Sequence, residues 1–171
     1  MALHRQSGRA PLTPETEYKR KFLVLIDDTP ECDRAVTFAA HRVKRTGGTV
    51  VLLSVIETAD FQQFLGVEDV MRAEACEEAE RLIDSRVARI ADIGDVRTET
   101  VVREGDPIIA IERLIAEDPG IAILVLAASP SKDGPGPLVT AFASRSGLGA
   151  LPILITIVPS SMTDEQIVAV A

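Results

Sequence analysis

The sequence predicts an α/β fold in which a single doubly wound, five-stranded parallel sheet lies between helices on both faces. Two observations support this prediction. Short apolar runs alternate along the chain with longer segments whose apolar residues recur with the helical period, so strands alternate with helices. Each connection is also long enough to hold the crossover helix that parallel neighbouring strands require. A length of 171 residues and a hydrophobic content of 46% suit one globular domain of this kind.

Apolar runs identify the five expected strands. A strand buried on both faces carries an almost continuous apolar run, as the segment from Phe22 to Ile26 does. The third run instead alternates valine and threonine with charged residues, which is typical of a strand near a sheet edge. Strands are expected at residues 22–26, 50–56, 96–103, 121–127 and 152–158.

Amphipathic segments between these runs predict four helices. Thr29 and Pro30 suit the cap and the first position of the first helix, and Gly47 ends it. Gly105, Asp106 and Pro107 start the third helix. Helices are expected at residues 30–46, 67–91, 108–117 and 138–146.

The predicted domain occupies residues 21–159 and has a tail at each end. Residues 1–20 show no apolar periodicity, so we expect a flexible amino-terminal tail. In residues 160–171, Thr163 and Asp164 precede several apolar positions. This pattern leaves two alternatives open, a short additional helix and a disordered tail.

Charge and cysteine content exclude several classes of function. The formal net charge of −8 argues against nucleic acid or an anionic membrane surface as the main partner. No apolar run approaches the roughly 20 residues of a membrane span, and the amino-terminal segment lacks the apolar core of a signal peptide. Cys32 and Cys76 belong to no metal-binding or redox motif. We therefore expect a cytoplasmic protein that binds small molecules or other proteins, without a metal.

Ligands of open α/β sheets bind beyond the carboxyl ends of the strands, where successive connections leave in opposite directions. This rule points to the loops after the first and fourth strands. The first loop begins with Asp27, whose carboxylate suits a ligand hydroxyl or an adenine amino group better than a phosphate. Alternatively, Asp28 and Glu31 simply favour the helix dipole and Thr29 caps the helix. A carboxylate that directly ends a buried strand needs a partner in either case.

The loop after the fourth strand is the candidate phosphate-binding segment. Its small residues and hydroxyls permit close approach of a ligand to the backbone, and a helix start follows. Three prolines remove amide donors, and Asp133 partly cancels the charge of Lys132. Neither a P-loop nor a GxGxxG motif is present. The candidate binding residues in and after this loop are Ala127, Ser129, Ser131, Lys132, Gly134, Gly136 and Thr140.

Several blocks of the sequence, taken together, resemble the universal stress protein family. They are Phe22 to Thr29, Val50 to Ile56, Gly105 to Pro107, Ile123 to Ala127 and Leu151 to Ile155. The resemblance implies a Rossmann-like α/β/α sandwich with strand order 3-2-1-4-5 and a homodimer formed through the last strand, Pro152 to Val158. In one branch of the family it also implies ATP between strands one and four, with Asp27 contacting the adenosine and a G-x2-G-x9-G-[ST] motif holding the phosphates and ribose.

The sequence departs from that motif. Ala127, Pro130 and Thr140 stand where the family pattern has glycine, and shifting the alignment by one position does not restore it. A proline removes an amide, and a side chain obstructs close approach of phosphate to the backbone. The resemblance therefore predicts the fold more strongly than it predicts ATP binding.

Three functions are compatible with these observations. The first is a dimeric binding or regulatory module in the stress response that lacks conventional ATP binding and acts through a protein partner. The second is a sensor of ATP, AMP or another adenine nucleotide that uses Asp27, Ser129, Ser131, Lys132 and Thr140 in an altered loop. The third is an enzyme acting at a phosphate, which is the least supported because no nucleophile and base pair, metal cluster or P-loop is present. We expect a protein without catalytic residues.

The last strand predicts self-association. Ile153, Leu154, Ile155, Ile157 and Val158 leave a sheet edge without the charges that usually protect one. Pairing this strand with its copy about a two-fold axis would satisfy both edges at once. The alternative is that the carboxyl-terminal segment folds over the edge.

Overall fold

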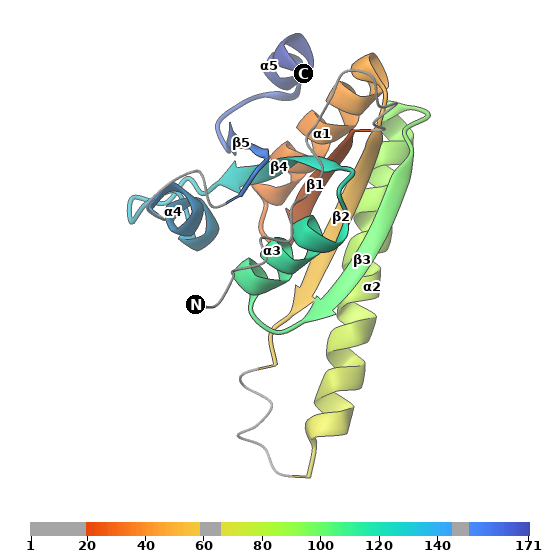
Figure 1. Cartoon of the computed structure of the whole chain (residues 1–171), viewed down its shortest axis with the longest axis vertical. Coiled ribbons are helices and arrows are strands. Elements are labelled where there is room, and N and C mark those ends of the chain that lie inside the picture. The colour runs from red at the N-terminus through yellow and green to blue at the C-terminus, as the bar shows by residue number, and fades with distance from the viewer. Residues whose placement is uncertain (1–19, 59–65, 145–150) are drawn as a thin grey trace, which may run out of the picture.

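Five parallel strands form the middle layer of the part of the chain that the structure describes, which comprises residues 20–58, 66–144 and 151–171 of a computed structural model (Figure 1). The order is β3-β2-β1-β4-β5, which confirms the predicted fold class and topology. The expected amino-terminal tail lies outside the described residues except for Arg20. The strands are β1 (Lys21–Ile26), β2 (Thr49–Ile56), β3 (Thr98–Glu104), β4 (Ile121–Ala128) and β5 (Leu154–Pro159).

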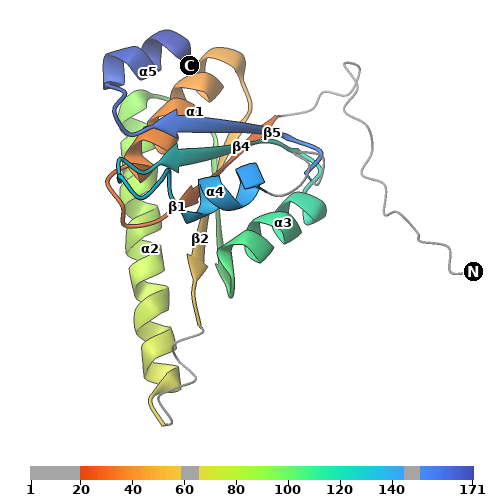
Figure 2. The same cartoon turned by 90° about the vertical axis from the view of Figure 1, so that its left-hand side faces the viewer.

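Helices cover both faces of the sheet (Figure 2). On one face, α1 and α2 pack over a core that includes Val24, Val36 and Ile90. On the other face, α3 and α4 cover a second core built around Leu23 and Ile111. The helices are α1 (Cys32–Thr46), α2 (Glu68–Ile93), α3 (Pro107–Glu117), α4 (Pro137–Ser144) and α5 (Asp164–Val170).

Two element boundaries differ from the sequence-based expectation for identifiable reasons. Helix α1 begins at Cys32 rather than at Pro30, and the prediction that Thr29 caps it is wrong. The amide and hydroxyl of Thr29 instead donate to the Asp27 carboxylate, which holds the preceding loop in a turn. Strand β5 begins at Leu154 rather than at Pro152, and a proline there has no amide to donate to the ladder.

The carboxyl-terminal segment forms a helix, which decides between the two alternatives for residues 160–171. Thr163 and Gln166 form a capping box at the start of α5, each side chain bonding the other's backbone amide. Ile167 is fully buried in the core beside α1. The helix therefore extends the layer formed by α1 and α2.

Lys21 joins three parts of the sheet at the end opposite the carboxyl ends of the strands. Its Nζ lies 2.6 Å from Glu99 Oε2 in β3 and 2.8 Å from Asp118 Oδ2, just before β4. Burial lowers the pKa of Lys21, but the hydrogen bonds and charges of the two carboxylates outweigh burial and raise it above its ordinary value of 10.5. The ammonium therefore contributes to stability as the charged form.

This raised pKa predicts a stability change at alkaline pH. The contribution is fully present below the unfolded-state pKa of 10.5 and is lost as the pH rises through the higher folded-state value. At about pH 9 the free energy of unfolding of the unmodified protein should therefore exceed that of Lys21→Met. At about pH 11.5 the difference between the two proteins should be smaller. Urea unfolding of both proteins across this range measures it. A difference that stays constant with pH would show that packing, and not charge, makes Lys21 important.

Candidate functional site

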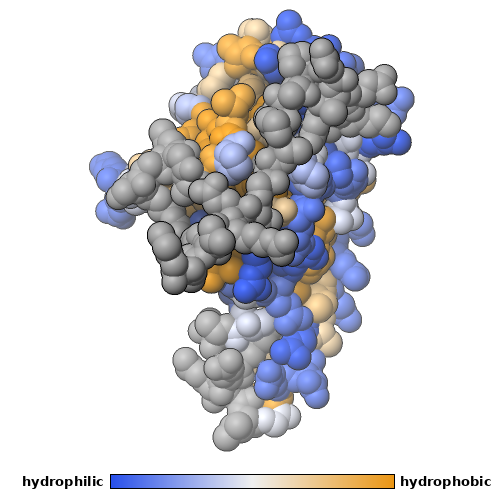
Figure 3. All heavy atoms as spheres, viewed as in Figure 1, coloured by the Kyte–Doolittle hydropathy of each residue, from blue (hydrophilic) through white to orange (hydrophobic). Residues whose placement is uncertain are grey.

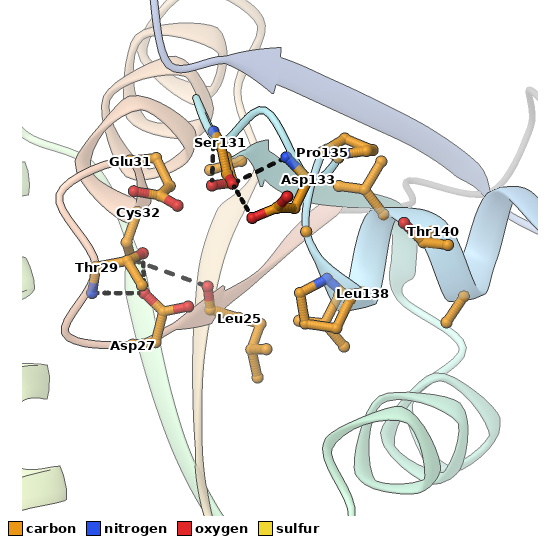
Figure 4. A pocket seen from close by; sticks show the side chains of 17 residues that line it. Leu25, Asp27, Thr29, Glu31, Cys32, Ser131, Asp133, Pro135, Leu138 and Thr140 are labelled. Atoms are coloured by element: carbon orange, nitrogen blue, oxygen red, sulfur yellow. Dashed lines mark hydrogen bonds between the residues drawn. The ribbon is translucent and has the colours of Figure 1, made fainter.

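A cleft of about 710 Å³ opens between the carboxyl ends of β1 and β4 (Figure 4). Here the connection from β1 leaves toward α1 on one face of the sheet, and the connection from β4 leaves toward α4 on the other. The cleft thus lies at the topological switch point that the sequence predicted. Its walls are the β1–α1 loop, the β4–α4 loop and the first turn of α4.

The structure brings together most of the predicted site residues. The cleft is lined by Asp27, Ala127, Ser129, Ser131, Gly134, Gly136 and Thr140. Lys132 is exposed and does not line it, because the loop turns its neighbours Ser131 and Asp133 toward the cleft instead. Apolar lining residues that sequence reasoning missed are Leu25, Cys32, Leu138, Val139 and Ala141. The sequence hinted at these apolar lining residues only through Leu138 and Val139, which directly follow the glycine- and proline-rich loop at the start of a predicted helix.

The carboxylate of Asp27, at the end of a buried strand, is hydrogen-bonded by Thr29. Its Oδ1 accepts the amide of Thr29 at 2.9 Å and also the Thr29 hydroxyl. The backbone carbonyl of Asp27 accepts a hydrogen bond of 3.1 Å from Nη2 of Arg86 in α2. The carboxylate therefore shapes the β1–α1 loop whether or not a ligand is bound.

The β4–α4 loop uses its own oxygens to satisfy its amides. The amide of Ser129 donates to the carbonyl of Pro135 at 2.9 Å, and that of Ser131 donates to the hydroxyl of Ser129 at 3.3 Å. The amides of Asp133 and Gly134 donate to the hydroxyl and the carbonyl of Ser131. These four amides are not available to a phosphate, and the loop's prolines at 130, 135 and 137 have none to offer.

The charge of the cleft also disfavours a polyphosphate. Asp27, Glu31 and Asp133 line it, whereas no lysine or arginine does so among the described residues. Phosphate sites in proteins normally combine free amides with a cation. This arrangement suits hydroxyl, amino or cationic groups better than a triphosphate.

Cys32 lies in the cleft wall but is protected. Its side chain is almost fully buried, and Sγ lies 3.9 Å from the carbonyl oxygen of Leu25, to which the thiol donates weakly. Burial, more than any neighbouring group, raises the pKa of the Cys32 thiol. The thiol is therefore protonated at neutral pH and is a poor nucleophile.

A smaller cleft of about 330 Å³ adjoins the first on the other side of the β1 terminus. The two share Leu25, Asp27, Pro137 and Leu138, so Asp27 lies between them. Glu57 after β2 and Asp106 at the start of α3 line the smaller cleft. The Asp106 side chain accepts a hydrogen bond of 3.0 Å from the amide of Ile109 and caps α3.

Within residues 20–58, 66–144 and 151–171 no helix has both the length and the hydropathy that crossing a bilayer requires. The same residues contain no group of three histidine, cysteine, aspartate or glutamate side chains arranged to hold a metal ion.

The fold and the cleft together define a doubly wound α/β protein with a cleft at its switch point. Comparison with known families names the class more closely. The sequence profile of the universal stress protein family matches residues 19–145, and the chain therefore belongs to that family.

Solved structures of the family share the fold at low sequence identity. The universal stress protein UspA of Lactobacillus plantarum is 19% identical, with a TM-score of 0.68 and coverage of 82% of this chain and 97% of that one. A universal stress protein family member from Burkholderia pseudomallei is 20% identical, with a TM-score of 0.63 and coverage of 85% and 99%. A universal stress protein in complex with cAMP is 16% identical, with a TM-score of 0.57 and coverage of 83% and 98%. Comparison with curated protein sequences finds no significant match.

The bonds of Asp27 predict that it stabilises the protein even without a ligand. Asp27→Ala leaves the amide and hydroxyl of Thr29 without their acceptor and should lower the free energy of unfolding by about 1–2 kcal/mol. Urea unfolding measures the change. Asp133→Ala is the matched control, because the one hydrogen bond to that exposed carboxylate within the described part of the chain is long, 3.4 Å from Ser131, and its loss should cost less than about 0.5 kcal/mol. Equal losses in both variants would contradict the role given to Asp27.

Proposed function

We propose that this chain is a dimeric binding module of the stress response that does not use the family's ATP site in the conventional way. One observation carries the proposal: four amides of the loop after β4 donate their hydrogen bonds to oxygens of the same loop. The missing glycines and the three carboxylates in the cleft act in the same direction. A triphosphate would meet neither these four amides nor a facing cation among the lining residues described. Regulation through a protein partner is the mode of action that we infer.

A second candidate function is favoured by the size and position of the cleft. About 710 Å³ at the switch point is within the range of small-molecule sites and accommodates a nucleoside. Asp27 and the hydroxyls of Ser129, Ser131 and Thr140 offer partners for ribose and adenine groups. A structural neighbour was solved in complex with cAMP, which carries a single phosphate charge. The alternative function is therefore a sensor of an adenine nucleotide with few phosphates.

A thermal-shift titration separates the two candidates. A ligand at 100 times its Kd stabilises a protein by about 2.7 kcal/mol, which corresponds to roughly 5–10 °C for a chain of this size. If the loop binds the triphosphate poorly, the Kd of Mg-ATP should be about 1 mM or weaker. We therefore expect Mg-ATP at about 1 mM to raise the melting temperature by less than about 2 °C. A shift of several degrees that disappears in Asp27→Ala would overturn the proposal.

The same titration with AMP and cAMP tests the second candidate. A shift of several degrees with either nucleotide, but not with Mg-ATP, would establish a sensor that tolerates one phosphate and excludes three. Lys132→Ala is the matched control, because Lys132 does not line the cleft and its loss should leave such a shift unchanged. Absence of any shift would leave the module without a nucleotide.

The proposed dimer is supported by a contrast between the two edges of the sheet. Strand β3 exposes Arg103 and Glu104, charged side chains of the kind that protect an edge. Strand β5 has no charged residue and exposes Leu154 (69%) and Ile157 (44%). Figure 3 shows apolar side chains gathered on the side of β5 and α5, whereas the projecting end of α2 is mostly hydrophilic. Helix α5 packs on α1, where Ile167 is buried, and its own Val168 and Val170 are exposed.

Light scattering coupled to size exclusion tests the dimer. At tens of micromolar we expect a mass about twice the 18.4 kDa of one chain. Ile157→Lys places a charge on the exposed face of β5 and should give monomer or aggregate, whereas Val102→Lys on the opposite edge strand should leave the dimer intact. Ile155→Lys is a less clean variant, because Ile155 packs on the core of its own chain. A monomeric mass for the unmodified protein would reject pairing through β5.

A further inference from the structure

A chain of charged contacts runs from the carboxyl-terminal helix to the cleft. At its outer end, Asp164 in α5 lies 2.6 Å from Nη1 of Arg34 in α1 and 3.9 Å from Nη2 of Arg89 in α2. Arg34 also donates to the carbonyl of Met162 at 3.2 Å, just before α5. Asp164 thus connects α5 to both helices of this face.

The inner end of the same chain reaches the wall of the cleft. Asp33 lies between two arginines, 3.6 Å from Nη1 of Arg89 and 3.3 Å from Nε of Arg86. Arg86 in turn donates to the backbone carbonyl of Asp27, which begins the β1–α1 loop. Arg86 and Arg89 are three positions apart on α2 and therefore lie on the same face of that helix.

Burial increases along this chain toward the cleft. The side-chain exposure falls from 59% at Asp164 to 31% at Arg89 and 15% at Arg86. The inner contacts are therefore less screened by solvent than the outer one. Arg89 is also held by the buried hydroxyl of Thr37, which accepts a bond of 3.0 Å from its Nε. Hydrogen bonds therefore hold Arg89 to Thr37 and Arg86 to the Asp27 carbonyl, and Asp33 lies between the two arginines as an ion-pair partner that hydrogen-bonds neither.

The packing of α5 adds to these charged contacts. Ile167 of α5 is buried in the apolar core of this face, against which Met162 packs and to which Cys32 at the start of α1 also belongs. Removing α5 would expose the part of this core around Ile167 and free Arg34 and Arg89 from Asp164 at the same time. Of these two carboxylates, Arg89 would then have only Asp33 as an ion-pair partner. Arg89 would compete with Arg86 for Asp33, since both arginines pair with it.

We propose that α5 is a latch that holds the β1–α1 wall of the cleft in place through Asp164, Arg89, Asp33 and Arg86. Release of α5 loosens the wall around Asp27 and exposes Cys32. Docking of α5 therefore regulates the shape of the cleft, which is open while α5 is docked. This inference deepens the proposed function, since it concerns the same cleft, but it does not require that a nucleotide bind there.

Cys32 provides the readout. Its thiol is almost fully buried beneath the β1–α1 wall, so its rate of alkylation by N-ethylmaleimide under native conditions reports the opening of that wall. Cys76, the other cysteine, is partly exposed and is replaced in a Cys76→Ser background. The rate is measured by mass spectrometry without any ligand, so the result is separate from the nucleotide titrations.

In this background, Asp164→Asn removes the carboxylate charge that pairs α5 with Arg34 and Arg89 and should raise the alkylation rate of Cys32 about threefold or more. Ile167→Ala undocks α5 by loss of packing and should raise it further. Arg81→Gln is the matched control, because Arg81 pairs only with Glu78 among the described residues, on the exposed face of α2, and its loss should leave the rate unchanged.

Global destabilisation is controlled separately. Ile111→Val lowers stability through the core on the opposite face of the sheet, and it should raise the alkylation rate far less than Asp164→Asn at an equal loss of melting temperature. Faster alkylation in Asp164→Asn but not in Ile111→Val supports the latch. An unchanged rate in Asp164→Asn overturns it, as does an equal increase in both variants.

Discussion

The burial of β1 at the centre of the sheet is the constraint from which the rest of the structure follows. Leu23 and Val24 are fully buried on opposite faces, so both faces must be covered by helices. With β2 on one side of β1 and β4 on the other, the connections from β1 and β4 part at their carboxyl ends. A cleft forms between them, and Asp27 stands where the central strand reaches it.

What that cleft can bind is decided by how the surrounding backbone meets its hydrogen-bond requirements. Exposed or half-buried amides need acceptors, and in the β4–α4 loop the serine hydroxyls and nearby carbonyls supply them. The same serines that appear in sequence as candidate ligands of a phosphate thus serve the loop itself. Asp27 follows the same principle on the opposite wall, because its carboxylate organises Thr29.

The carboxyl-terminal helix gives one face of the domain a feature that the other lacks. Helix α5 joins α1 and α2 through Ile167 and through the charges around Asp164, while no comparable helix is described beside α3 and α4. The face that carries α5 also contains Arg86, which reaches the cleft. A segment outside the five-stranded core is thereby connected to the wall of the cleft.

The sequence by itself determined the fold class, the alternation of elements and the location of the cleft, because hydrophobic periodicity and crossover length are local properties of the chain. It also identified Asp27 and the loop after β4, since these follow buried strands. Only the tertiary structure decided that Thr29 serves Asp27 instead of capping α1, that Lys132 stands outside the cleft, and that α5 docks on α1. These outcomes depend on which of several competing partners lies within reach in three dimensions, and contacts such as Arg86 to Asp27, separated by 59 positions, leave no periodic trace in sequence.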